Sequence, residues 1–234
     1  MKLATDSEHV VITGTNGSGK SHEALYQLSQ RSFDTRPWVI VNFKRGDLVD
    51  QVPVTARMTV HDAPPTDPGL YVADARWEDG QRGGALDRFL MKCLDQGRIG
   101  IFIDEGQMLT PPHYGLRSVL TRGRHPEVCL MFITQRPAHV DTFAFSECKY
   151  IQMFQLFHPD DHARIAAYVP PDMVDFDALA EAGEHHSLYF DLRARTVELV
   201  GPAPDFMEIH RRILTRLPVY VDAKEPVRPP RIRL

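Results

Sequence analysis

Short runs of apolar residues, separated by segments with helical spacing, dominate the first 160 residues. Runs of this length are typical of strands buried on both faces of a mostly parallel sheet. The predicted strands are 9–13, 38–43, 99–103, 128–134 and 150–157, with a shorter one at 70–73. Helices are predicted at 20–31 and at 84–96, where apolar residues recur about every 3.6 positions. The pattern predicts an α/β fold.

The pattern changes after residue 158. Short helices are predicted at 160–168 and 175–182, a hairpin at 188–192 and 196–200, and a helix at 206–217. Three prolines predict an extended tail at 222–234. We therefore expect an α/β core over 1–160, a small C-terminal appendage over 161–221 that completes the same domain, and an extended tail rich in proline and arginine over 222–234.

Composition narrows the class of protein. The 234 residues are 43% hydrophobic and 25% charged, which is ordinary for one globular domain. A formal net charge of −4 argues against a protein that wraps nucleic acid by charge alone, although transient contact with DNA stays open. Three cysteines without CxxC spacing make a disulfide framework unlikely to form and indicate a reducing, cytoplasmic setting. No run approaches the roughly 18 apolar residues of a membrane span.

The strongest motif lies between the first predicted strand and the first predicted helix. It fits GxxxxGK[ST] at every fixed position, and its residues are Gly14, Thr15, Asn16, Gly17, Ser18, Gly19, Lys20 and Ser21. Glycines let backbone N–H groups turn inward around phosphate oxygens, and the following helix presents its positive end. Lys20 is predicted to contact the β- and γ-phosphates of ATP, and the Ser21 hydroxyl to bind Mg²⁺. The alternative is a glycine-rich turn with a chance Lys-Ser.

Two carboxylates end the strand at 99–103. Asp104 is predicted to hold Mg²⁺, directly or through water, and Glu105 to act as the general base on the attacking water. By itself such a pair is equally compatible with a solvated turn. The next strand, 128–134, ends in Gln135, which suits a sensor of the γ-phosphate in P-loop ATPases of the additional-strand class. No NKxD motif of a GTPase is present.

These motifs together resemble one superfamily. The segments ITGTNGSGKS, GIFIDEGQML and FITQRP are similar to those of the FtsK–HerA superfamily of hexameric DNA-pumping ATPases, over roughly residues 8–160. Within it, the short chain without a membrane segment resembles the DNA-packaging ATPases of tailless, internal-membrane (tectivirus-like) phages. The resemblance implies an additional-strand (ASCE, RecA-like) P-loop fold with a mostly parallel central sheet flanked by helices.

The resemblance also implies the activity and its partners. We expect ATP hydrolysis with Mg²⁺, coupled to translocation of double-stranded DNA into a viral procapsid. The active form is expected to be a homo-oligomeric ring, namely a hexamer. An arginine from the neighbouring subunit would complete each site, and Arg122 and Arg124 are the first candidates, with Arg136 third. Contact with proteins of the capsid vertex, and a location in the host cytoplasm or at the packaging vertex of the virion, follow from the same resemblance.

Three alternatives stay open at this point. A P-loop small-molecule kinase would need a substrate pocket and an arginine lid. A filamentous-phage-type assembly ATPase shares the motifs but usually carries a membrane segment. An assembly protein that binds ATP only as a structural switch would not be stimulated by DNA.

Overall fold

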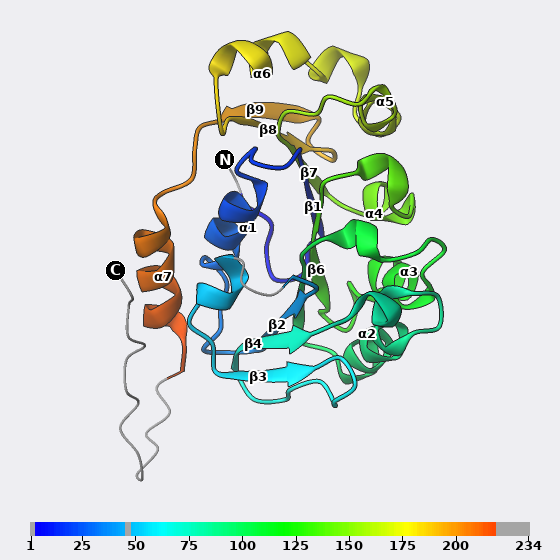
Figure 1. Ribbon diagram of the computed structural model, residues 1–234, viewed down its shortest axis with the longest axis vertical. Coiled ribbons are helices and arrows are strands. Elements are labelled where there is room, and N and C mark those ends of the chain that lie inside the picture. Colours follow the sequence, from blue (N-terminus) through cyan, green and yellow to red (C-terminus); the bar gives the residue numbers. More distant parts are fainter. Residues whose placement is uncertain (1–2, 45–47, 219–234) are drawn as a thin grey trace.

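The computed structural model describes residues 3–44 and 48–218, so the predicted tail at 222–234 lies outside the described residues. Within them the chain forms one sheet with flanking helices (Figure 1). The strands are β1 (Val10–Thr13), β2 (Pro37–Asn42), β3 (Ala56–Thr59), β4 (Gly69–Asp74), β5 (Gly100–Ile103), β6 (Cys129–Thr134), β7 (Tyr150–Met153), β8 (Ser187–Asp191) and β9 (Thr196–Val200). The helices are α1 (Lys20–Leu28), α2 (Ala85–Gln96), α3 (Tyr114–Arg122), α4 (Phe143–Ser146), α5 (Pro159–Ala166), α6 (Phe176–Ala182) and α7 (Phe206–Arg216).

The order of the strands is β3-β4-β2-β5-β6-β1-β7-β8-β9. Neighbouring strands from β3 to β7 run parallel, whereas β7–β8 and β8–β9 are antiparallel. Strand β6 lies between β5 and β1, where the additional-strand class places the strand that carries its sensor. The predicted fold class is therefore confirmed.

Helices cover both faces of this sheet (Figure 1). Alternate residues of β1 enter different cores: Val10 and Ile12 pack with α1 and α7, while Val11 packs with α2 and α3. The same alternation runs through β2 and β6. Because both faces are buried, these strands are apolar at consecutive positions, which is why they were recognisable as continuous runs.

Parallel pairing gives the sheet two functionally different edges. Strands β1, β5 and β6 all end at one edge, which we call the carboxyl edge, and all begin at the other, the amino edge. Residues 14, 104 and 135 directly follow these three adjacent strands. The fold thus brings the three predicted motifs to one edge, as ligand sites of open α/β sheets require.

Several boundaries differ from the prediction. The strand predicted to 157 ends at Met153, because the chain then crosses the loop after β1: Phe154 N donates to Thr13 O at 2.8 Å, and Thr15 N donates to Gln155 O at 3.1 Å. The helix predicted to 31 ends at Leu28. Strand β3 and helix α3 were not predicted, since β3 is a largely exposed strand at the end of the sheet and α3 contains a glycine and two serine or threonine residues.

The C-terminal segments continue the sheet. Strand β8 pairs with β7, so the predicted hairpin extends the sheet that carries the motifs. Helix α7 packs beside α1, and its Arg216 donates to the carbonyl of Ser29 at 2.9 Å. Across the described residues, none of the helices has the length and apolarity needed to cross a membrane.

Candidate nucleotide-binding and hydrolysis site

The loop between β1 and α1 has the geometry of a phosphate cradle. Gly17 and Gly19 have φ angles of +77° and +92°, in the left-handed region that favours glycine, and α1 begins at Lys20. A Cβ atom at Gly14 would lie 2.5 Å from the Cβ of Phe154, so only glycine fits there. The loop therefore lies at the positive end of α1, which is where phosphate groups bind.

Two side chains inside the loop fit a phosphate ligand. Lys20 is 4% exposed, and its Nζ donates to the carbonyl of Thr15 at 3.3 Å, which holds the ammonium against the loop. The Ser18 hydroxyl is buried and has no hydrogen-bond partner among the described residues. A buried polar atom of this kind is costly unless a ligand satisfies it.

Asp104 lies directly after β5 and is buried. Its Oδ1 accepts a hydrogen bond from the backbone N of Glu105 at 3.1 Å. Its carboxylate and the Ser21 hydroxyl, on the first turn of α1, carry hard oxygen atoms of the kind that Mg²⁺ prefers. The described residues contain no cluster of three or more His, Cys, Asp or Glu side chains suited to a metal, and a magnesium site that shares its ligands with phosphates needs none.

Glu105 occupies an unusual backbone position. Its φ angle is +58°, left-handed, and its side chain is 3% exposed. The Nε2 of Gln135 donates to both of its carboxylate oxygens, at 2.8 and 3.0 Å. The structure thus joins the predicted base and the predicted sensor directly, across 30 residues of sequence and two adjacent strands.

Two residues at this carboxylate were not predicted. Gln107, on the short 3₁₀ turn Gly106–Met108, donates to Glu105 Oε2 and accepts from Thr134 Oγ1 at 3.0 Å and from Gln135 N at 3.1 Å. Lys44, two residues past β2, forms an ion pair with Glu105 Oε1. Gln107 lies within the segment GIFIDEGQML, but no role was predicted for it or for Lys44; only the adjacency of β2, β5 and β6 brings them together.

The C-terminal appendage also reaches the loop. A Cβ atom at Gly19 would lie 3.0 Å from Nδ1 of His185, so this histidine covers the start of α1. A cavity of about 190 Å³ lies between the loop and residues 183–186. From the sequence alone, His185 and the adjacent His186 could be interpreted only as part of a loop, because Gly19 lies more than 160 residues away along the chain.

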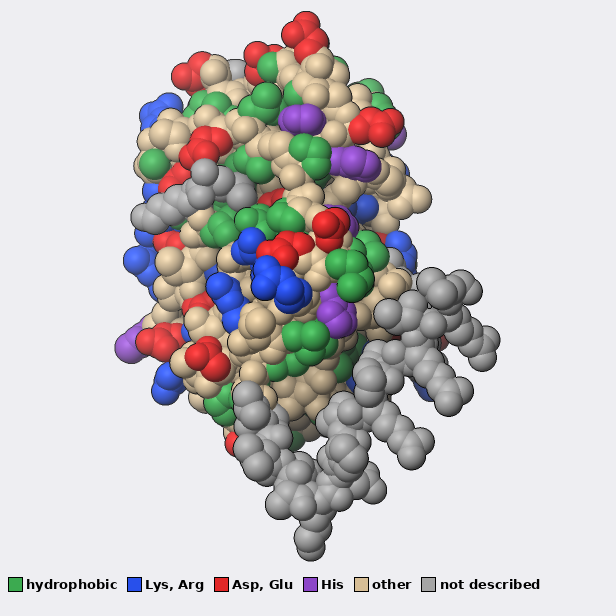
Figure 2. All heavy atoms as spheres, turned by 90° about the vertical axis from the view of Figure 1, so that its left-hand side faces the viewer, with side chains coloured by type: hydrophobic (Ala, Val, Ile, Leu, Met, Phe, Trp, Pro, Cys, Tyr) green, Lys and Arg blue, Asp and Glu red, His purple; other side chains and the backbone are tan. Residues whose placement is uncertain are grey.

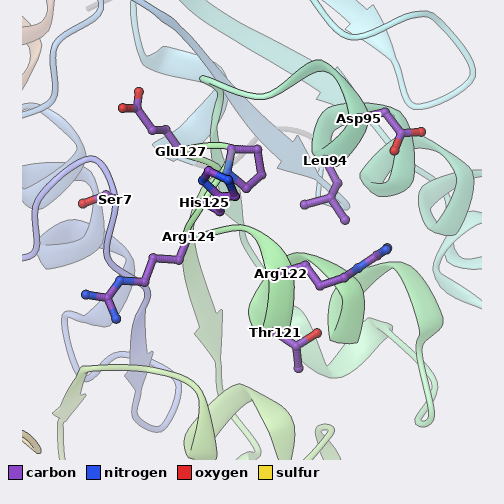
Figure 3. A pocket seen from close by; sticks show the side chains of 9 residues that line it. Ser7, Leu94, Asp95, Thr121, Arg122, Arg124, His125 and Glu127 are labelled. Atoms are coloured by element: carbon purple, nitrogen blue, oxygen red, sulfur yellow. The ribbon is translucent and has the colours of Figure 1, made fainter.

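The two candidate arginines lie elsewhere. Arg122 and Arg124 precede β6 and therefore lie at the amino edge, about 20 Å from Gln135 along a six-residue strand. They line a cavity of about 860 Å³, where their side chains point in different directions (Figure 3). Arg122 contacts Met91 Sδ at 3.8 Å, and the Arg124 guanidinium makes no hydrogen bond or ion pair with the described residues. Arg136, at the carboxyl edge, is bound to Asp161 at 2.9 Å.

Comparison with known proteins gives the following matches. No protein-family model matches the chain. The DNA packaging ATPase P9 of Enterobacteria phage PRD1 is 28% identical over 214 residues, which cover 87% of this chain and 91% of P9. Among solved structures, the genome packaging NTPase B204 of Sulfolobus turreted icosahedral virus 2 with AMPPCP matches with a TM-score of 0.65 at 18% identity, over 86% of this chain and all of B204. VirB4 of Thermoanaerobacter pseudethanolicus matches with a TM-score of 0.64 at 11% identity, over 89% of this chain and 93% of VirB4.

The matches agree with the site geometry. The similarity to P9 spans nearly the whole of both chains, and the two structural matches share the fold of this sheet. The predicted resemblance to phage DNA-packaging ATPases is confirmed by the similarity to P9. The chain therefore shares the fold of B204 and VirB4 and is similar, over nearly its whole length, to the DNA packaging ATPase P9 of phage PRD1.

Proposed function

We propose that the chain is the ATP-hydrolysing subunit of a motor that moves double-stranded DNA into a viral procapsid. The observation that carries this proposal is the similarity to P9 along nearly the whole of both chains. The site supports it, because the phosphate cradle, Asp104, Glu105 and Gln135 lie together at the carboxyl edge. A small-molecule kinase has no counterpart among the matches described above.

In the proposed reaction the chain's own groups divide the work. The loop from Gly14 to Ser21 binds the phosphates, and Lys20 offsets their charge. Glu105 accepts a proton from the attacking water at a carboxylate oxygen. Gln135 directly follows β6 and binds both Glu105 and Gln107, so in this proposal it couples the state of the base to that strand. Mg²⁺, held by Ser21 and Asp104, would supply charge neutralisation for phosphoryl transfer.

The arginine of the reaction comes from a neighbouring subunit in this proposal. A guanidinium at the amino edge cannot reach the site of its own chain, so it suits a ring in which the amino edge of one subunit faces the carboxyl edge of the next. Both arginines are exposed, and Arg124 is the better candidate because Arg122 contacts Met91, whereas the Arg124 guanidinium has no contact within the described residues that a neighbour's phosphate would have to displace.

DNA would be held only briefly. On the face that carries α7, basic and acidic side chains are interspersed rather than gathered by sign (Figure 2). A motor must release DNA at each step, and weak static affinity suits that requirement. Such a motor would act in the cytoplasm of the host cell or at the packaging vertex of the virion, against vertex proteins of the capsid.

The test is the ATPase rate of the purified chain with and without double-stranded DNA, measured beside its mass in solution. We expect a ring, of six subunits by the family resemblance, whose hydrolysis rises with DNA and requires Mg²⁺. A monomer that phosphorylates a small molecule, or a ring whose ATPase ignores DNA, would contradict the proposal.

A further inference from the structure

Two cavities lie between the phosphate loop and the C-terminal segments, on the side of β1 opposite to β5 and β6. One, of about 190 Å³, adjoins the loop and residues 183–186. The other, of about 230 Å³, lies beside the first turn of α1, where His22 lines it, and is bounded from the C-terminal segments by Pro202. His185 lines both cavities, and the proposed reaction gives this residue no role.

The order of the strands decides which end of a nucleotide points toward these cavities. Glu105 and Gln135 follow β5 and β6, which lie on one side of β1. In the proposed reaction the γ-phosphate must lie on that side, because the base must reach the water that attacks it. The rest of the nucleotide then extends across the phosphate loop toward the other side of β1. There the chain that follows β7 and the chain that precedes β8 line the two cavities.

The antiparallel strands β8 and β9 bring His185 to the carboxyl edge. Ser187, at the start of β8, pairs with Val200, at the end of β9, beside the end of β7. The segment just before β8 therefore lies against the phosphate loop, where a Cβ atom at Gly19 would lie 3.0 Å from Nδ1 of His185. The backbone of His185 has a φ of +63°, a left-handed conformation that His and Asn tolerate better than most residues. Its side chain is exposed rather than packed into the core, so its ring is available to a ligand.

We propose that His185 contacts the nucleoside part of ATP, so that the C-terminal segments complete a site that the phosphate loop begins. The imidazole ring stacks on the base, since every nucleobase offers a flat face to an aromatic side chain, while the phosphates stay on the loop. The two cavities together have the size of a small-ligand site. The inference rests on the proposed binding of ATP phosphates by the loop, and it gives the appendage a part in nucleotide binding.

The test measures, by titration calorimetry on the full chain, the binding of two probes: the ATP analogue AMPPCP, and inorganic tripolyphosphate, which has three linked phosphates and no nucleoside. His185→Asn keeps a residue that tolerates the left-handed backbone and removes the aromatic ring, so affinity for AMPPCP should fall about tenfold. Affinity for tripolyphosphate should stay at the wild-type value, because the phosphate loop is unchanged. His210→Ala is the matched control: His210, half-buried on α7, lines neither cavity, and its loss should change neither affinity.

Two results would overturn the inference. One is an unchanged affinity for AMPPCP in His185→Asn. The other is an equal loss of affinity for AMPPCP and for tripolyphosphate, because the histidine would then act on the phosphate loop and not on the nucleoside. If His185→Asn fails to fold, His185→Gly serves with the same expectations, since glycine adopts a left-handed backbone freely. Failure of the proposed function is distinguished in the wild-type chain alone, as ATP hydrolysis that DNA does not stimulate, which these binding measurements do not involve.

Discussion

The two edges of the sheet differ in how their polar groups are engaged. At the carboxyl edge, Glu105, Gln135 and Gln107 bind one another across two segments of the chain. At the amino edge, Arg124 is exposed and its guanidinium makes no contact within the described residues. An edge whose groups satisfy one another is built to act within the subunit, whereas an edge that presents a charged group without a contact is suited to a neighbour.

The edges also bury ionisable groups with opposite pH responses. Near the carboxyl edge, burial raises the pKa of Glu23 to about 7, although Gln27 donates to its carboxylate at 3.1 Å. At the amino edge, burial lowers the pKa of His9 to about 4, and its Nδ1 accepts from Leu130 N at 3.1 Å. Both groups are held in their neutral forms, so stability should be greatest between the two titrations.

The largest loss of ATP hydrolysis should come from a substitution at the amino edge. Arg124→Ala should lower ATP hydrolysis by about 10³–10⁵-fold if the guanidinium stabilises the transition state in a neighbour's site. Arg122→Ala, at the same edge, is the matched control and should cost much less. In rings mixed from Arg124→Ala and Glu105→Gln subunits, some interfaces pair two intact residues, so ATPase activity should return. If rings verified to contain both variants stay inactive, Arg124 does not act in the site of a neighbouring subunit, and the proposed difference between the two edges is wrong.

The carboxyl edge gives the next largest effect. Glu105→Gln should reduce kcat by about 10²–10⁴-fold, because the amide cannot accept the water's proton. Binding of a fluorescent ATP analogue should remain, since the phosphate cradle is untouched. By contrast, Lys20→Ala should weaken that binding as well as abolish hydrolysis. Hydrolysis by Glu105→Gln near the wild-type rate would show that Glu105 is not the base.

The contributions of Glu23 and His9 to folding stability can be distinguished by their pH dependence. The pKa of Glu23 in the folded chain lies above its ordinary value of 4.5, so its neutral form favours folding at low pH and this advantage is lost as pH rises from about 4.5 through 7. Glu23→Gln should therefore raise the free energy of unfolding at pH 8 by about 2–3 kcal/mol and change it little at pH 4. Urea unfolding at both pH values measures this.

The contribution of His9 to stability has the opposite pH dependence. Its folded pKa lies below the ordinary 6.5, so stability that is present above pH 6.5 is lost as pH falls toward about 4. His9→Asn can still accept a hydrogen bond from Leu130 N. It should reduce the loss of unfolding free energy between pH 6.5 and about 4 and leave the pH dependence of the unfolding free energy above pH 7 unchanged. Unfolding curves of the two variants that kept identical pH dependence would contradict the assignment of these groups.

The smallest expected effect is a difference in ATP affinity between alanine substitutions at two glycines of the phosphate-binding loop. Gly14→Ala brings a Cβ within 2.5 Å of Phe154 and 2.6 Å of Ser18 Oγ, so the loop must move, and ATP affinity should fall by about tenfold or more. Gly17→Ala meets nothing within 4 Å and adds only the cost of a left-handed φ, about 1–2 kcal/mol of folding stability. Titration calorimetry should show that Gly17→Ala retains more of the ATP affinity than Gly14→Ala does.

The sequence by itself determined the secondary-structure elements and those site residues that local patterns of neighbouring residues predict. Among the described residues, apolar runs located six of the seven strands in the first 160 positions to within a few residues, and also the hairpin beyond them. The loop from Gly14 to Ser21 was readable because its glycines, lysine and serine must be consecutive to surround a phosphate. Asp104 and Gln135 were readable because each directly follows an apolar strand.

Tertiary structure alone decided which of these residues meet. The contacts of Glu105 with Lys44 and Gln135, and of Gly19 with His185, join segments 30 to 166 residues apart. Such contacts follow from the order and direction of the strands, which depend on how the two apolar faces pack, and no local spacing records that order. For the same reason the sequence pointed to Arg122 and Arg124 but could not place them at the edge opposite their own phosphate loop.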